Sequence, residues 1–292
     1  MMTLNKVFNG SSIDEVIQLL DKYNKDAKVI AGGTDIIIAL KNSKISPKVL
    51  IDIGKIKDLK KIENIDNKII IGSAVTFTQI IENEIFNDNL YGLYKSCRMV
   101  GSPQIRNKGT IGGNIANASP AADSIPPLIA LGAKLKIMSK RGIREVLIED
   151  YFSDRSTLGI KEDELLISIE FEKPEENQIL SFAKLGLRKA LAISRITAST
   201  LIGVDEEFKI NYIKVASGSI GKYPMREYDV EIELLGKKFN SDIIDIATNS
   251  IQNSMDRRLA GRSTLPYKRR AIVSVLEEAL KDCMSYYSGV VL

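Results

Sequence analysis

The chain contains no histidine, and this absence excludes several kinds of chemistry. Without an imidazole there can be no Ser–His or Cys–His nucleophile pair, no histidine metal ligand and no flavin attached through histidine. Catalysis must therefore come from other side chains or from a bound cofactor, and we expect no catalytic residue and no metal ligand in this chain.

Cysteine and long apolar runs are scarce too. Cys97 and Cys283 lie far apart in the sequence, so this chain alone cannot supply the usual ligands of a zinc site or an iron–sulfur cluster. The first residues lack the basic and apolar regions of a signal peptide, and no stretch approaches the ~18 apolar residues of a membrane helix. We therefore expect a soluble protein of the reducing cytoplasm that does not bind a membrane.

Charge of one sign is also lacking, because 41 Lys and Arg face 37 Asp and Glu, which leaves +4. This balance is too weak to indicate a nucleic-acid partner. Basic residues do gather at 257–270, but an acidic helix is expected to follow them. We interpret this basic segment as a subunit contact or as a solvated face.

The 292 residues, 44% of them hydrophobic, are enough for one large domain or two modest ones. Ser12 and Glu15 fit a capping box, and the apolar spacing after them predicts a helix over 13–24. A strand at 27–31 then leads through Gly32–Gly33 into an apolar element of open type at 36–40. Strands are predicted at 49–53, 69–73, 133–138, 145–148 and 165–171, with helices at 78–83 and 90–99.

The polar stretch at 172–179 indicates a boundary between two packed units. Beyond it we predict strands at 193–204 and 212–217, followed by helices at 241–253 and 267–281. The fold class is therefore α+β, without the even alternation of a doubly wound sheet. We expect domains at 1–175 and 178–286.

Two segments rich in small residues are candidates for ligand binding. The first has paired glycines after a strand, which let backbone N–H groups approach an anion, although a simple tight turn explains it equally well. It consists of Val29, Ile30, Ala31, Gly32, Gly33, Thr34, Asp35 and Ile36. It matches neither the P-loop nor the GxGxxG pattern.

The second segment, 101–123, is almost entirely small, polar or glycine, with little charge. Such a composition suits a backbone that wraps closely around a ligand, with Thr110, Asn114 and Ser119 as donors and Asp123 as an acceptor. The alternative is an ordered loop that closes the edge of a sheet.

These residues also resemble a known family, the FAD-binding subunits of the molybdenum hydroxylases, which include xanthine, nicotinate and carbon monoxide dehydrogenases. The resemblance covers the chain from about residue 4 to its end and is nearest to the bacterial xanthine dehydrogenase subunits. The motifs that carry it are AGGTD at 31–35, QIRNKGTIGGN at 104–114, ASPAADSIP at 118–126, LLISIEF at 165–171 and FAKLGLRKALAISR at 182–195. It implies a two-part FAD-binding domain of the vanillyl-alcohol-oxidase or p-cresol-methylhydroxylase type and a small C-terminal α+β flavoprotein domain.

The resemblance assigns roles to individual residues, with FAD held non-covalently. Residues 29–36 and the motif Thr110, Ile111, Gly112, Gly113 and Asn114 would hold the FAD diphosphate. Gly101 would approach the flavin, Ser119 matches a family serine, and Asp123 would bind a ribose or adenine group. Leu166 would contact the adenine side, and Lys184 would lie near the pyrimidine end of the flavin ring.

An ammonium at that position would stabilise the negative charge that a flavin gains on reduction, whereas Lys184 taken alone is an exposed strand residue. Arg106 either neutralises phosphate or fixes its loop, and a thioether between Cys97 and FAD is disfavoured. One departure concerns Ala192, where many relatives carry an acid. The lack of that acid bears on the flavin potential and on reactivity with NAD.

The function that the resemblance implies is electron transfer. A molybdopterin-binding large subunit would hydroxylate an N-heterocycle such as xanthine, and electrons would pass through the [2Fe-2S] clusters of a small subunit to the FAD and on to NAD+. A quinone or ferredoxin stays open as the final acceptor, because either could meet a similar flavin. Two alternatives stay open. One is a free-standing flavin oxidoreductase, and the other is a non-redox adenine-nucleotide-binding or assembly protein.

Overall fold

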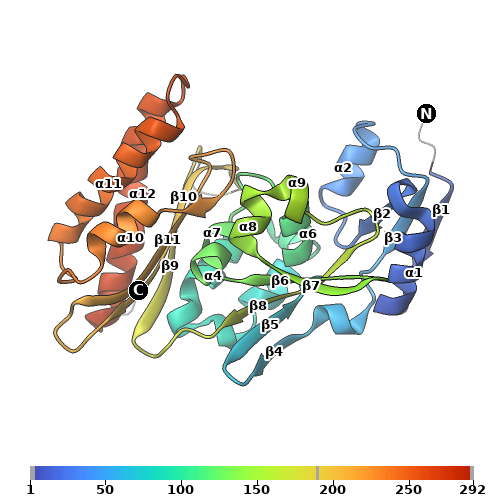
Figure 1. Cartoon of the computed structure of the whole chain (residues 1–292), viewed down its shortest axis with the longest axis horizontal. Helices are drawn as coiled ribbons and strands as arrows, with labels where there is room; N and C mark the ends of the chain where they lie inside the picture. The colour runs from blue at the N-terminus through green and yellow to red at the C-terminus, as the bar shows by residue number, and fades with distance from the viewer. Residues whose placement is uncertain (1–3, 189–190, 290–292) are drawn as a thin grey trace. The chain divides into compact units, whose positions relative to one another are not determined.

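The structure is a computed structural model that describes residues 4–188 and 191–289 (Figure 1). Lys189 and Ala190 of the FAKLGLRKALAISR motif lie outside the described residues. The chain folds into two compact units that alternate along the sequence. Unit 1 comprises Met1–Ile80, Ser102–Ala118 and Ala133–Glu172, and unit 2 comprises Ile81–Gly101, Ser119–Gly132 and Lys173–Leu292. One crossing between the units follows Glu172, and the division into domains at 1–175 and 178–286 stays a prediction.

The first helix of unit 1 begins at the predicted capping box. The Glu15 N–H donates to Ser12 Oγ at 3.2 Å, and the Glu15 carboxylate accepts from the Ser11 N–H at 2.8 Å. The reciprocal partner is thus Ser11 and not Ser12. Because Val16 and Leu20 lie on one face of this helix, both are buried.

Unit 1 contains two sheets. The three-stranded sheet has the order β1-β3-β2 with parallel pairing, and the five-stranded sheet has the order β4-β5-β8-β6-β7 with antiparallel pairing. Helix α1 packs against strands of both sheets, and the buried cluster includes side chains from α1, β2, β3 and β8. The mixed α+β class is confirmed.

The elements of unit 1 follow the predicted order closely. They are β1 (Lys6–Asn9), α1 (Ile13–Tyr23), η1 (Asn24–Asp26), β2 (Ala27–Ile30), α2 (Ile36–Lys41), β3 (Val49–Asp52), η2 (Lys57–Lys60), β4 (Ile62–Ile65), β5 (Lys68–Gly72), α3 (Phe77–Ile81, which extends one residue into unit 2), α5 (Pro103–Arg106), α6 (Ile111–Asn117), β6 (Lys134–Ser139), β7 (Gly142–Leu147), α8 (Ile148–Ser153), α9 (Arg155–Leu158) and β8 (Leu165–Glu172).

The small-residue segment at 101–123 has more regular structure than the sequence indicated, and its contact with a ligand stays a prediction. It contains two short helices, α5 and α6, because the hydroxyls of Ser102 and Thr110 accept from backbone N–H groups in their first turns. Pro103 at the first position of α5 favours the same outcome. The strand predicted at 145–148 ends one residue early, because Ile148 begins α8.

Unit 2 is built on an antiparallel sheet of four strands in the order β12-β11-β10-β9. Helices α10, α11 and α12 cover one face, and α4 and α7 pack against the other (Figure 1). Strand β10 is buried along nearly its whole length, as expected for a strand with both faces covered. The predicted order of strands first and helices afterwards is confirmed for residues 178–287.

The elements of unit 2 include two segments from the first half of the chain. They are η3 (Glu84–Phe86), η4 (Asp88–Leu90), α4 (Tyr91–Arg98), α7 (Ile125–Ala130), β9 (Gln178–Gly186), β10 (Ser194–Val204), β11 (Ile210–Gly218), β12 (Met225–Arg226), α10 (Tyr228–Leu234), α11 (Asp242–Arg258) and α12 (Leu265–Tyr287). Among the described residues, no helix is both long and apolar enough to cross a membrane.

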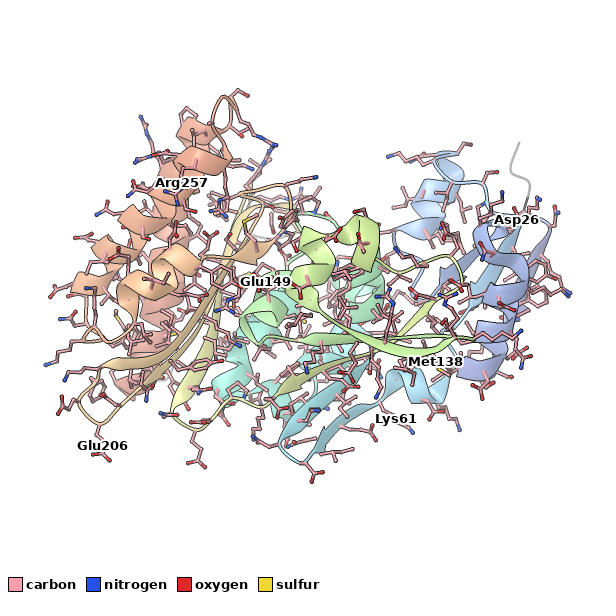
Figure 2. The ribbon with its side chains drawn as sticks, viewed as in Figure 1. Asp26, Lys61, Met138, Glu149, Glu206 and Arg257 are labelled. Atoms are coloured by element: carbon pink, nitrogen blue, oxygen red, sulfur yellow. The ribbon has the colours of Figure 1, made fainter. Side chains whose placement is uncertain are left out.

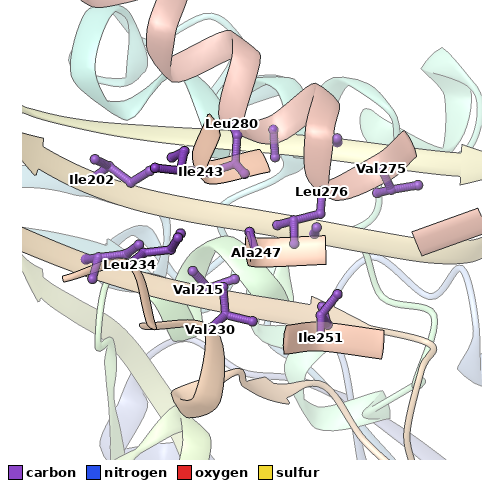
Figure 3. Close-up of a cluster of buried hydrophobic side chains, with 14 of the residues drawn as sticks. Ile202, Val215, Val230, Leu234, Ile243, Ala247, Ile251, Val275, Leu276 and Leu280 are labelled. Carbon is purple, nitrogen blue, oxygen red and sulfur yellow. The ribbon is translucent and has the colours of Figure 1, made fainter. Parts of the chain in front are cut away.

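The core of unit 2 lies between the sheet and the three C-terminal helices (Figure 3). Side chains from β10 and β11 face apolar residues of the helices, and burial of these side chains supplies the main stabilising free energy. The labelled members are Ile202, Val215, Val230, Leu234, Ile243, Ala247, Ile251, Val275, Leu276 and Leu280.

The basic segment at 257–270 is partly internal to unit 2. Arg258 makes a bidentate ion pair with Glu227, with N–O distances of 3.0 and 2.9 Å, and the carboxylate is almost completely buried. Arg257 of α11, labelled in Figure 2, makes an exposed pair with Asp229 of α10. Arg258 is thus mostly buried and paired within unit 2, so it is not a solvated residue.

We predict that Arg258→Met destabilises the protein by about 3–5 kcal/mol, because the buried Glu227 carboxylate loses its partner. Arg257→Gln, which breaks an exposed pair, should cost under about 1 kcal/mol. Urea unfolding of the wild-type protein and the two variants measures both losses in the free energy of unfolding.

The Arg258–Glu227 pair also makes the effect of the Arg258→Met substitution on stability depend on pH. Burial raises the pKa of Glu227 against the opposing charge of Arg258, so loss of Arg258 should raise this pKa further. The folded Arg258→Met variant then binds a proton more readily than the unfolded chain, and its destabilisation should shrink between about pH 7 and about pH 5. A deficit that grows on acidification would contradict this account.

Candidate functional site

The two predicted small-residue segments meet within unit 1. Gly32 lies against the backbone of the second segment so closely that a Cβ built on it would be 1.7 Å from the Lys108 carbonyl oxygen and 3.0 Å from the Gly109 nitrogen. No side chain fits between these backbones. The contact joins segments that are more than seventy positions apart in the sequence.

The first segment runs from the end of β2 into α2. Gly33 has φ +76°, a conformation that favours glycine, and its carbonyl accepts from the Ile37 N–H at 3.2 Å. Asp35 stands at the N-cap of α2 without a side-chain capping bond. The turn therefore leads directly into a helix, and the open assignment of 36–40 is resolved as helical.

The second segment is anchored to the turn after β5. The N–H groups of Ile111 and Gly112 donate to the carbonyls of Val75 and Ser73, each at 3.0 Å. The buried Thr110 side chain caps α6 by accepting from the Gly113 N–H at 3.1 Å. These bonds fix the start of α6 close to β5.

The glycines of the two motifs are needed for different structural reasons. A Cβ on Gly112 would lie 2.5 Å from both the Cβ and the carbonyl oxygen of Ser73, so Gly112, like Gly32, is required by close backbone packing. Gly113 is exposed, and Gly33 supplies the turn. Packing therefore explains Gly32 and Gly112, and the Gly113 N–H donates to the capping hydroxyl of Thr110.

This arrangement fits a diphosphate group on two observations. The first is the pair of glycine-rich turns in backbone contact. The second is the Ser73 hydroxyl, which is buried without a hydrogen-bond partner within the described part of the chain, beside Gly112. Buried polar atoms are normally paired, so an unpaired one next to the motif marks a candidate ligand contact. No motif of the sequence indicated Ser73 as a site residue.

Leu166 also belongs to unit 1. It lies in β8 opposite Ile137 of β6 and is buried. The structure places it in the five-stranded sheet, and its predicted contact with the adenine side of FAD stays a prediction.

Asp123 and Lys184 form a buried ion pair in unit 2. Lys184 Nζ donates to Asp123 Oδ2 at 2.5 Å, and the side chains are only 8% and 7% exposed. Ser194 donates to the other carboxylate oxygen. Burial raises the pKa of Asp123, and the neighbouring ammonium and hydroxyl oppose this shift. Lys184 is thus not the exposed strand residue that its position alone indicated.

Other predicted residues of unit 2 lie around this pair. Lys184 Nζ also donates to the Met99 carbonyl at 3.1 Å, two residues before Gly101, which has φ +44°. Ser119 Oγ accepts from the Ala121 N–H in the turn that leads to Asp123. Residues 99–101, 119–123 and 184 therefore converge within unit 2, and Ser194 joins them without having been predicted.

The sequence related two further residues, Cys97 and Ala192, to a flavin. Cys97 is completely buried in α4, and burial raises the pKa of its thiol to about 12, so a reactive thiolate is disfavoured. Ala192 lies close to Gly186, where a Cβ built on the glycine would be 2.7 Å from the Ala192 methyl group. Within the described residues, no group of three or more Cys, Asp or Glu is placed to hold a metal ion.

Comparison with known proteins supports the same interpretation. The profile of the family described as "FAD binding domain in molybdopterin dehydrogenase" matches residues 3–174. The profile described as "CO dehydrogenase flavoprotein C-terminal domain" matches residues 181–283. Together these two matches cover nearly the whole chain.

Related proteins match over almost their full length. The nicotinate dehydrogenase FAD-subunit of Eubacterium barkeri is 31% identical over 97% of both chains. The putative xanthine dehydrogenase FAD-binding subunit XdhB of Escherichia coli is 28% identical over 96% of both chains. A solved Cu,Mo-CO dehydrogenase contains a chain with the same fold, with a TM-score of 0.89 over 98% of this chain and 99% of that one, at 24% identity. The chain belongs to the FAD-binding subunits of the molybdenum hydroxylases and is an oxidoreductase subunit.

Proposed function

We propose that this chain takes electrons from [2Fe-2S] clusters of a partner subunit and delivers them, through its FAD, to NAD+. The observation that carries the proposal is the backbone contact of Gly32 with Lys108 and Gly109 in a chain of this family. FAD supplies the redox chemistry, since it accepts electrons and can give up a hydride. The protein binds and orients the cofactor, and no side chain needs to act as a general acid or base.

In unit 1, the turn at 29–36 would hold the diphosphate through backbone N–H groups, and residues 110–114 would line the same site. The N–H groups of Ile111, Gly112 and Gly113 already donate within the protein, so they would fix the shape of the site. Backbone donors suit this task because glycine lets a phosphate oxygen come close to the chain. The Ser73 hydroxyl is a further candidate donor beside Gly112. Thr110 would act indirectly, because its side chain fixes the first turn of α6.

In unit 2, Lys184 would approach the pyrimidine end of the flavin. Its ammonium has three N–H donors, and Met99 O and Asp123 Oδ2 accept from it, which leaves one donor for a flavin oxygen. Asp123 and Ser194 would hold the ammonium in place. Asp123 can still accept from a hydroxyl or ring N–H group of FAD, because a carboxylate has several lone pairs.

The partners are a molybdopterin-binding large subunit and a [2Fe-2S] small subunit. Two kinds of relative support the proposal of these partners. Some are named as subunits or medium chains of dehydrogenases, and one is a chain of a solved Cu,Mo enzyme with the same fold. The hydroxylation would take place on the large subunit. The substrate class that we propose is an N-heterocycle such as xanthine.

Anaerobic addition of NADH tests the proposed acceptor, because hydride transfer is reversible between NADH and the flavin. We expect NADH to bleach the flavin absorbance of the purified protein. Dithionite provides the control for a reducible flavin. Bleaching by dithionite but not by NADH would exclude NAD+ as the acceptor and leave FAD binding intact.

Lys184→Met should lower the flavin midpoint potential by roughly 30–60 mV. This value corresponds to the loss of one charge-assisted hydrogen bond that is stronger in the reduced state. The potential should fall whatever the protonation state of Asp123 in the variant. If Asp123 takes up a proton, the positive charge of Lys184 is still lost, and if Asp123 stays ionised, it repels the negative charge that the flavin ring gains. Spectroelectrochemical titration measures the potential.

Lys214→Met is the matched control, since it removes an ammonium from β11 of the same sheet. Its potential should stay at the wild-type value. Equal shifts in both variants would show a general charge effect and would contradict the placement of Lys184 beside the flavin.

A further inference from the structure

Three basic residues of unit 2 gather near the start of α12. Arg195 is the second residue of β10, Arg262 lies in the loop between α11 and α12, and Lys268 lies in the first turns of α12. We call Arg195, Arg262 and Lys268 the cation cluster. The Arg262 carbonyl accepts from the Leu265 N–H at 3.0 Å at the start of α12, and hydrogen bonds through Ser219 connect Lys268 to Ser194, the neighbour of Arg195. Burial lowers the pKa of Lys268, and the charges of Arg195 and Arg262 lower this pKa further.

Hydrogen bonds connect the cation cluster to the buried Asp123–Lys184 pair. Lys268 Nζ donates to the Ser219 carbonyl, and Ser219 Oγ donates to the Ser194 carbonyl at 3.4 Å. Ser194 Oγ in turn donates to Asp123. The cluster therefore lies next to the part of unit 2 that we propose to approach the flavin.

Nothing in the described chain neutralises the cation cluster. Arg195 and Arg262 have no carboxylate partner among the described residues, and the first turn of α12 contains no acid. By contrast, Arg257, Arg258 and Arg269 of the same region all pair with carboxylates. Like charges near the positive end of a helix repel one another, so this arrangement favours binding of an anion.

We propose that the cation cluster binds the diphosphate of a nicotinamide dinucleotide. This inference rests on the proposed transfer of electrons to NAD+. Two guanidinium groups suit a diphosphate because each can donate two parallel hydrogen bonds to phosphate oxygens, and the Lys268 ammonium adds a point charge. A dinucleotide bound there would have its anionic part beside the hydrogen-bonded path to Asp123 and Lys184, which are proposed to lie near the flavin.

Pre-steady-state reduction of the flavin by NADH tests the cluster. In Arg195→Gln and Arg262→Gln, the NADH concentration for half-maximal reduction rate should rise about tenfold in each variant, since each loses one charged hydrogen-bonding group. Both side chains are exposed, so the variants should fold and retain FAD. The limiting rate of reduction at saturating NADH should stay unchanged.

Reduced nicotinamide mononucleotide gives a second readout, because it lacks the diphosphate bridge. Its half-maximal concentration should change much less in the two variants than that of NADH. Arg257→Gln is the matched charge control, as it removes an exposed arginine from α11 that pairs with Asp229 (Figure 2). It should behave as wild type.

The outcomes separate the two proposals. If NADH reduces the wild-type flavin and the three arginine variants all respond alike, the cation cluster is not the diphosphate site, whereas the acceptor proposal stands. If NADH fails to reduce a flavin that dithionite reduces, both proposals are wrong. A selective loss of NADH affinity in the Arg195 and Arg262 variants, with unchanged FAD content, supports the inference.

Discussion

The structure depends above all on the approach of two backbones in unit 1. Gly32 contacts the Lys108 carbonyl at a distance that no other residue allows, and Gly112 contacts Ser73 in the same manner. These contacts bring the turn after β2, the turn after β5 and the start of α6 together. Because glycine is needed for the packing itself, the exposed Gly113 backbone and the Gly33 turn are held in fixed positions. The positions of both motifs thus follow from a packing constraint, and we propose that they hold the diphosphate of FAD.

In unit 2, a buried ion pair holds a charged side chain in a fixed position. Burial of Asp123 and Lys184 is unfavourable for each charge alone, and their hydrogen bonds with Ser194 and the Met99 carbonyl offset this cost. Breaking such a pair is expensive, so the ammonium keeps its position. A charge that is held in advance can stabilise a reduced cofactor without reorganisation. The two units thus differ: unit 1 holds two backbones in close contact, and unit 2 holds a buried charge in a fixed position.

Much of this could be predicted from the sequence because the signals are local. The capping box at Ser12, the apolar spacing after it and the β-branched runs of β10 and β11 each report on neighbouring residues. The order of the motifs also identified the family. Helix α6 was missed because its two glycines have low helix propensity, which the side-chain cap at Thr110 overcomes. Helix α5 was missed because it is a single turn of four residues, capped by Ser102. The burial of Lys184 and the role of Ser194 depend on long-range contacts and left no local signal.

The FAD content of Gly32→Ala tests the central claim most directly. A methyl group at this position cannot fit against Lys108, so the two turns must separate. Gly54→Ala is the matched control, because its Cβ would meet only the movable Asp52 side chain at 3.0 Å and the Ala31 carbonyl at 3.6 Å. We predict that Gly54→Ala retains stoichiometric FAD, whereas Gly32→Ala remains folded by circular dichroism and loses most of its FAD. A folded Gly32→Ala protein with wild-type FAD affinity would contradict the account.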